Sequence, residues 1–93
     1  MQQPQHSPTP ALDQIRPRVL RALHVRGWHR DDRRDLWPEA VQVGRRCVVR
    51  GSRDGMRLTL ELVEGDDGVV TYVPSGSGGP SAVRDLLAEE VLG

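Results

Sequence analysis

Within residues 55–65, GMRLTLELVEG, positions 56–62 alternate apolar and polar side chains without a break, and this alternation constrains the fold more than any other feature. The apolar set is Met56, Leu58, Leu60 and Leu62. The polar set is Arg57, Thr59 and Glu61. Because successive side chains of a strand point to opposite faces, this period predicts a strand with one buried face. The flanking dipeptides Asp54-Gly55 and Asp67-Gly68 favour hairpin turns, since Gly adopts positive φ without strain.

Two further strands are expected beside this one. Residues 39–51, EAVQVGRRCVVRG, carry apolar side chains at alternate positions: Val41, Val43, Cys47 and Val49. We interpret them as one strand with a bulge at Gly44. The last strand is predicted over Val69–Val73, and Pro74 closes it because proline has no amide donor. The three strands form an antiparallel meander.

Helical periodicity occurs on both sides of the strands. The first segment repeats apolar residues at steps of three and four: Leu12, Ile15, Val19, Ala22 and Leu23. Gly27 is a natural stop, and Pro17 predicts a main helix near residues 17–26 after a preceding turn. Beyond the flexible connector 74–81, the second segment repeats the helical pattern: Val83, Leu86, Leu87 and Val91.

These elements predict a single two-layer α+β domain over residues 11–93. Its order is a helix, a three-stranded antiparallel meander and a helix (α-β-β-β-α), with both helices on one sheet face. Residues 1–10 are rich in proline and glutamine, so we expect a disordered tail there. The other sheet face points outward and mixes polar and apolar side chains, which makes it the candidate partner-binding surface. Its members are Arg57, Thr59, Glu61, Val69, Thr71 and Val73.

Charge is divided unevenly along the chain, although the net charge is zero. Residues 16–57 hold twelve Arg and five acids, a balance of +7, whereas residues 58–93 hold one Arg and seven acids, a balance of −6. The two halves either neutralise each other or leave a basic surface for nucleic acid, whose phosphates Arg binds bidentately. Such a surface would use Arg18, Arg21, Arg26, Arg30, Arg33, Arg34, Arg45 and Arg46.

Motifs for catalysis, cofactors or metals are missing from the sequence. The single cysteine, Cys47, cannot form an internal disulfide, and no Cys and His residues have zinc-site spacing. His29 is followed by three aspartates, but Arg30, Arg33 and Arg34 are interleaved with them, and positive charge disfavours a bound cation. We therefore expect no catalytic residue, no cofactor and no metal, and a protein that is not an enzyme.

The overall composition favours a cytoplasmic bacterial protein without a membrane partner. No apolar run approaches the length of about 18 residues that a membrane helix needs, and the sequence begins without a charged-then-apolar leader. The absence of Lys, Asn and Phe, whose codons are rich in A and T, indicates a GC-rich genome.

Two of the three aromatic residues enclose the charged stretch WHRDDRRDLW, residues 28–37. Trp28 follows the predicted helix stop, and Trp37 precedes Pro38 at the start of the first strand. We interpret the stretch as a loop whose two rings pack on the core, while the charges between them pair in solvent.

Two families resemble parts of this pattern. The order helix, three strands, helix, which ends in LLAEEVLG, looks like that of double-stranded-RNA-binding domains and small HicA-type toxins over residues 11–92. That likeness implies RNA binding or cleavage, but the basic cluster of the last helix corresponds in this chain to Arg84 alone, beside Asp85, and the toxins' strand histidine has no counterpart. Residues 47–74 resemble the strand meander of type III secretion chaperones, which implies a dimer that holds an effector. We assign the chain to neither family.

Our leading expectation is a small non-enzymatic protein-binding module, such as an adaptor, chaperone or inhibitor. It would use the outward sheet face for homodimerisation or partner docking, which would also help to stabilise a core limited by 93 residues. The alternative is a nucleic-acid-binding domain that uses the Arg-rich first half.

Overall fold

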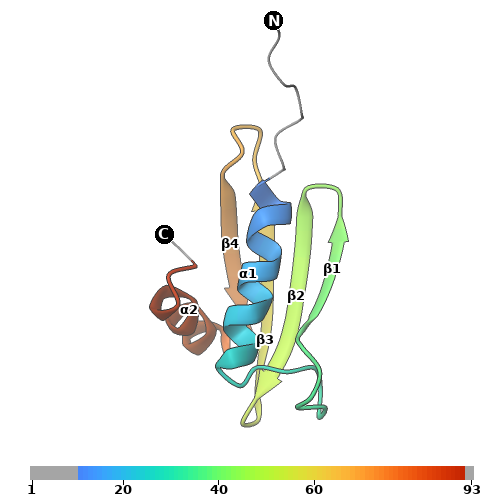
Figure 1. Ribbon diagram of the computed structural model, residues 1–93, viewed down its shortest axis with the longest axis vertical. Helices are drawn as coiled ribbons and strands as arrows, with labels where there is room; N and C mark the ends of the chain where they lie inside the picture. Colours follow the sequence, from blue (N-terminus) through green and yellow to red (C-terminus); the bar gives the residue numbers. More distant parts are fainter. Residues whose placement is uncertain (1–10, 92–93) are drawn as a thin grey trace, which may run out of the picture.

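The computed structural model describes residues 11–91 and shows two helices packed on an antiparallel sheet (Figure 1). The elements are α1 (Ala11–Val25), β1 (Glu39–Val43), β2 (Arg46–Arg53), β3 (Met56–Glu64), β4 (Val70–Ser75) and α2 (Gly79–Ala88). The strands form a meander in the order β1-β2-β3-β4, and α1 lies across the front of it in Figure 1. The α+β class is therefore confirmed. The tail expected over residues 1–10 lies outside the described residues.

The sheet has four strands, so the expected three-stranded meander is wrong by one strand. The segment interpreted as one bulged strand is a hairpin, in which Gly44 and Arg45 form the turn and Val43 pairs with Arg46. Gly44 has a φ of +60° while Arg45 keeps a negative φ. Gly at the first central position is the type II′ pattern, whose twist matches that of the flanking strands. Gly44 thus reverses the chain instead of bulging it.

The middle of the sheet follows the sequence pattern closely. The leucines of β3 are buried as expected: Leu58, Leu60 and Leu62. Asp54 and Gly55 both have positive φ and form the predicted turn between β2 and β3. β4 runs through Pro74, so the expectation that this residue closes the strand is wrong. Pro74 lies opposite Leu60 with its nitrogen on the free side of an edge strand, where no sheet hydrogen bond is lost.

α1 is continuous from Ala11, so the expected start of the main helix near residue 17 is also wrong. Pro17 lies inside the helix at an exposed position, and its missing amide is outweighed by packing of the apolar helix face. That face buries Leu12, Val19, Ala22 and Leu23. The Leu12 amide donates a hydrogen bond to Glu64 Oε1 at 2.9 Å, which ties the first turn of α1 to the end of β3.

The helix stop predicted at Gly27 is confirmed, and it directs Trp28 into the core. Gly27 has a φ of +93°, and the Trp28 amide donates to the Leu23 carbonyl at 2.9 Å. This is the geometry of a Schellman cap, in which the chain turns back over the last helical turn. The Trp28 side chain is fully buried as a result.

Trp28 links both helices to the sheet. Its Nε1 donates a hydrogen bond to Asp85 Oδ2 in α2 at 2.9 Å, and the Arg53 guanidinium of β2 lies 4.4 Å from its ring centroid. Arg53 also forms an ion pair with Asp85 at 2.6 Å. Gly78 packs so closely on the ring that an added Cβ would lie 2.5 Å from a ring carbon. Trp28 is therefore a structural anchor.

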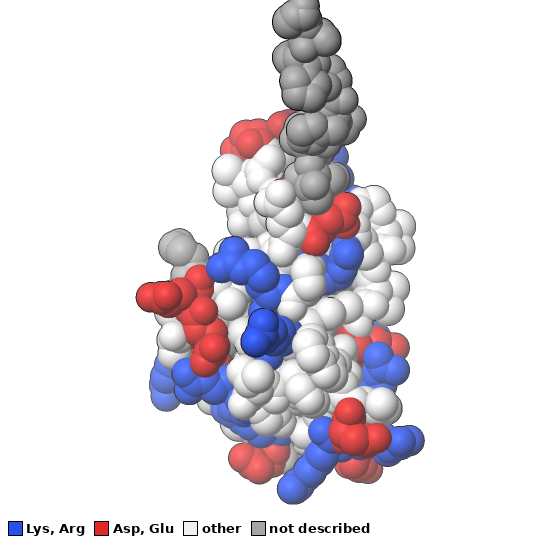
Figure 2. All heavy atoms as spheres, viewed as in Figure 1, with Lys and Arg blue, Asp and Glu red and all other residues white. Residues whose placement is uncertain are grey.

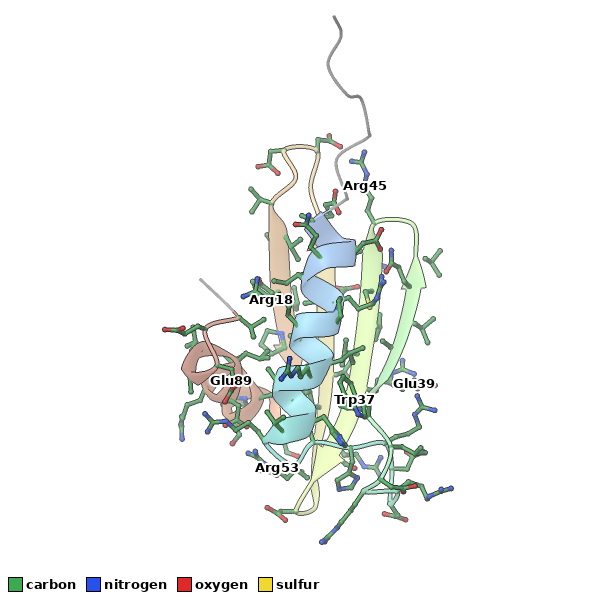
Figure 3. The ribbon with its side chains drawn as sticks, viewed as in Figure 1. Arg18, Trp37, Glu39, Arg45, Arg53 and Glu89 are labelled. Atoms are coloured by element: carbon green, nitrogen blue, oxygen red, sulfur yellow. The ribbon has the colours of Figure 1, made fainter. Side chains whose placement is uncertain are left out.

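The charged loop between the two tryptophans borders the sheet at one end. His29 pairs with Ser52, so it lies beside the end of β2 that β1 does not reach. Trp37 is 45 % exposed, and its ring stacks on His24 with the centroids 5.1 Å apart (Figure 3). The expectation that both rings pack on the core is thus right for Trp28 and wrong for Trp37.

α2 completes the helical layer by packing on β3, β4 and α1. Ala82 and Leu86 are buried, and the Val91 amide donates to the Leu86 carbonyl at 3.0 Å, which returns the chain to the core. Leu87 was expected in the apolar stripe, but it lies on the solvent side of α2 and is 55 % exposed. The core therefore lies between the two helices and one face of the sheet.

Candidate functional site

The sheet side opposite the helices, called the outer face below, is built from every second residue of the strands. The strand register arranges these residues in transverse rows that run from β1 to β4: Val41-Val48-Glu61-Val73, Val43-Arg46-Val63-Thr71 and Glu39-Arg50-Thr59-Ser75. Ser52 and Arg57 continue the outer face toward the β2–β3 turn. Within residues 11–91, both helices pack on the other face, so the outer face is open to solvent.

Apolar side chains are exposed on the outer face, where a solvated sheet normally carries polar ones. Val41 and Val43 of β1 are 54 % and 77 % exposed, and Val73 of β4 is 53 % exposed. A shallow groove of about 190 Å³ runs along β1 and β2, lined by Glu39, Val41, Val43, Arg46, Val48 and Arg50. Single exposed valines are ordinary, whereas neighbouring ones that line a groove are typical of an interaction site.

Charged side chains of the outer face carry both signs: Arg46, Arg50 and Arg57 lie among Glu39 and Glu61. Arg46 Nε lies 2.8 Å from Glu61 Oε2 on the neighbouring strand, and Glu39 lies opposite Arg50. Opposite charges at cross-strand positions stabilise a sheet modestly. This mixture of valines with charges of both signs resembles the composition of a protein interface more than that of a polyanion site.

The residues that the sequence proposed for partner binding lie on this side of the molecule. Arg57, Thr59 and Glu61 belong to β3, and Thr71 and Val73 belong to β4. Val69 immediately precedes β4 and is exposed.

Sequence reasoning missed the valines of β1 and β2 because it took them as part of one strand. In a single strand, Val41 and Val43 would share a face with the buried Cys47. In the hairpin, Val43 pairs with Arg46 instead, so the valines of β1 share the outer face with Val48. The available signal was the two-residue spacer that begins with Gly44 between two alternating segments.

The arginines proposed for nucleic acid come from several parts of the fold. Arg45 lies at the end of the sheet far from the loop that carries Arg30 and Arg34, and Arg18 lies on α1 (Figure 3). On the helical side of the molecule, acidic and basic atoms are intermixed (Figure 2). The first half of the chain therefore forms no continuous basic surface on that side.

Ion pairs also neutralise four of these eight arginines among residues 11–91. The pairs are Arg26–Glu89, Arg33–Asp35, Arg45–Asp66 and Arg46–Glu61. Three of them join the basic first half to acids of the second half, as does the pair between Arg53 and Asp85. Ion pairs therefore link the basic first half of the chain to the acidic second half.

Cys47 is the single thiol of the chain, and His24 and His29 are the imidazoles of the described residues. Burial raises the pKa of the Cys47 thiol, although the nearby Arg16 lowers it in part, and a neutral buried thiol is a poor nucleophile. Nδ1 of His24 and Nδ1 of His29 are buried, and within residues 11–91 neither has a hydrogen-bond partner that would orient the imidazole as a base. No three His, Cys, Asp or Glu side chains of residues 11–91 form a metal-binding group.

A hollow of about 320 Å³ lies where α1 meets the charged loop and the β2–β3 turn. It is lined by His24, Arg26, Gly27, Trp28, His29, Arg34, Arg53 and Asp54. Arg26 and Arg53 are already neutralised, by Glu89 and Asp85 respectively. Because its remaining charges are mixed, we assign no ligand to this hollow.

The fold and the outer face define a small two-layer α+β protein with one open sheet face. No helix among residues 11–91 is long and apolar enough to cross a membrane. Comparisons with protein-family models, curated proteins and solved structures gave no match to this chain. The four-stranded order also departs from the helix, three strands, helix order on which the likeness to double-stranded-RNA-binding domains rests.

Proposed function

We propose that this protein is a non-enzymatic protein-binding module, an adaptor, chaperone or inhibitor, that docks a polypeptide on its outer face. The observation that carries the proposal is a sheet face that no element within residues 11–91 covers and that still exposes valines at both of its edges. A sheet with one solvated face normally alternates apolar and polar residues, whereas β2 places Val48 outward and Val49 inward.

The chemistry of the outer face favours a protein as the partner. Removing a valine side chain from water contributes about 1.5 kcal/mol or more, so a partner that covers several of these valines gains substantial binding energy. Arg46 and Glu61 already neutralise each other, so this arginine attracts phosphate less than an unpaired one would. Apolar side chains among charges of both signs are common in protein interfaces.

Photo-cross-linking tests this proposal directly. A benzophenone amino acid replaces Val73 on the outer face or, as the control, Leu87 on α2. The two side chains have nearly equal exposure, 53 % and 55 %, but lie on opposite sides of the sheet. After irradiation in the cells that make the protein, we expect protease-sensitive adducts from position 73 and far fewer from position 87.

Substitution of the same surface provides the complementary test. Changing Val69 and Val73 together to Asp should abolish the adducts of a probe at position 75 of the same face, with a melting temperature close to that of the wild type, because both substituted side chains are exposed. Adducts that nuclease rather than protease removes would support the nucleic-acid alternative. Equal adducts from positions 73 and 87 would contradict a dedicated outer face.

A further inference from the structure

β1 is an edge strand with little of the protection that edge strands usually carry. In the part of the chain that the structure describes, it pairs with β2 alone. An edge presents a row of free N–H and C=O groups, which proteins normally shield with proline, charged side chains or a covering element. The sequence of β1, EAVQV, contains no proline and one charged residue, Glu39 at its start. Its other end exposes Val43 by 77 %.

The hairpin geometry identifies the backbone groups on this free edge. A two-residue turn makes the flanking pair, Val43 and Arg46, a hydrogen-bonded pair. Alternation from that pair points the N–H and C=O groups of Ala40 and Gln42 away from β2. The hydrogen bond from the Glu64 amide to the Arg45 carbonyl, at 2.9 Å, follows the same alternation on the next strand pair.

The opposite edge of the sheet, β4, is better protected against pairing with a further strand. The same alternation turns residue 74 of β4 outward, and proline at that position has no donor to offer a further strand. α2 follows β4 closely and packs against it. A further strand therefore finds a better template on β1 than on β4.

We propose that β1 pairs antiparallel with β1 of a second copy of this chain, so that the two sheets become one continuous sheet in a homodimer. This inference goes beyond the proposed function, because it concerns the free edge of the sheet and not its outer face. It also extends that function, since the outer faces of the two copies become one surface for a further partner.

A two-fold axis through Val41 lets the free backbone groups of both edge strands pair with each other. Ala40 of each copy then forms a hydrogen-bonded pair with Gln42 of the other, and both residues carry the free backbone groups. Val41 meets Val41 of the second copy on the outer face, in the pair type whose side chains lie closest. Glu39 lies opposite Val43 of the second copy, and Val43 is paired with Arg46 of its own chain. Glu39 of one copy therefore approaches Arg46 of the other at both ends of the strand pair. The contact is isologous and closes as a dimer.

Sedimentation equilibrium of the full chain with two substitutions at one position tests this pairing. Gln42→Pro removes the outward amide, and proline is tolerated on the free side of an edge strand. Gln42→Ala is the matched control, because it loses the same side-chain contacts to Asp13 and Arg16 and keeps the amide. We expect the wild type and Gln42→Ala to form dimers, and Gln42→Pro to dimerise at least about tenfold more weakly.

Further measurements keep each outcome interpretable. If Gln42→Pro fails to fold by circular dichroism, Val43→Glu, which places a negative charge at an exposed side chain directly opposite Glu39 of the second copy, should weaken the dimer instead. A wild type that stays monomeric at about 1 mM, or a Gln42→Pro dimer as tight as that of Gln42→Ala, would overturn the inference. Cross-linking at Val73, which lies on β4 at the opposite edge of the sheet from β1, reports on the docking proposal separately. Absence of protein adducts there beside an intact dimer would remove the docking proposal and leave the dimer.

Discussion

At the scale of single residues, Asp85 holds the helical layer to the sheet. Its carboxylate accepts the Trp28 Nε1 hydrogen bond at 2.9 Å and pairs with Arg53 at 2.6 Å, and both ionic side chains are largely buried. Removing it leaves a buried N–H without an acceptor and a largely buried guanidinium without a counter-charge. Asp85 therefore matters for stability although it lies far from the outer face.

We predict that Asp85→Ala lowers the free energy of unfolding by about 3 kcal/mol, as measured by urea denaturation. Asp35→Ala is the control, because its pair with Arg33 is exposed, and it should change stability by less than about 0.5 kcal/mol. Equal effects of the two substitutions would show that the contacts of Asp85 are not held in solution.

Cys47 links stability to alkaline pH, because its burial raises the pKa of the thiol. The folded chain then keeps the proton at a pH where the unfolded chain, with an ordinary thiol pKa of about 8.5, begins to lose it. The stabilisation is complete below that value and is lost as the pH rises toward the raised pKa of the folded state. We expect the unfolding free energy to fall more steeply above about pH 8.5 for the wild type than for Cys47→Ala. Parallel pH profiles in urea titrations would count against this.

At the scale of elements, the β1–β2 hairpin decides which valines reach the outer face. Gly44 has a φ of +60°, which strains any residue with a Cβ, although the space around it is open. We predict that Gly44→Ala costs at least about 1 kcal/mol of stability in urea denaturation. Arg45→Ala, at the other turn position, should cost less than about 0.5 kcal/mol because its pair with Asp66 is exposed. A neutral Gly44→Ala would mean that the turn adopts another conformation.

The elements that the sequence predicted best are those whose local signals agree with their packing. The unbroken alternation of β3 and the glycine at position 27 each have one physical interpretation, and the structure confirms both. The side-chain positions of β3 on the outer face followed from the same alternation, which is why Thr59 and Glu61 lie there as expected.

The elements that the sequence predicted less well are those where a local rule competes with tertiary packing. Pro17 was expected to begin a helix, but burial of the apolar face holds α1 together on both sides of it. Pro74 was expected to end a strand, but an edge strand has one side on which a donor is not required. A glycine such as Gly44 occurs in both bulges and turns, so the sequence alone does not distinguish them. The bulge interpretation placed Val41 and Val43 on the buried face, whereas the turn places them on the outer face.

At the scale of the whole molecule, the unequal halves of the chain neutralise each other. Arg26, Arg45 and Arg46 each pair with an acid from the second half, and Figure 2 shows both signs intermixed on the helical side. The distribution of charge along the sequence therefore did not predict its distribution on the surface. The sheet and its exposed valines remain the more distinctive feature.

Hydrogen exchange at two protein concentrations tests most directly whether this sheet meets another chain. The amides of Ala40 and Gln42 point away from β2, so they should exchange rapidly in a monomer and become protected as concentration rises. The amide of Tyr72, on the outward side of β4, should exchange at the same rate at both concentrations. We predict this contrast between the two edges; exchange at Ala40 and Gln42 that does not change with concentration would contradict the account.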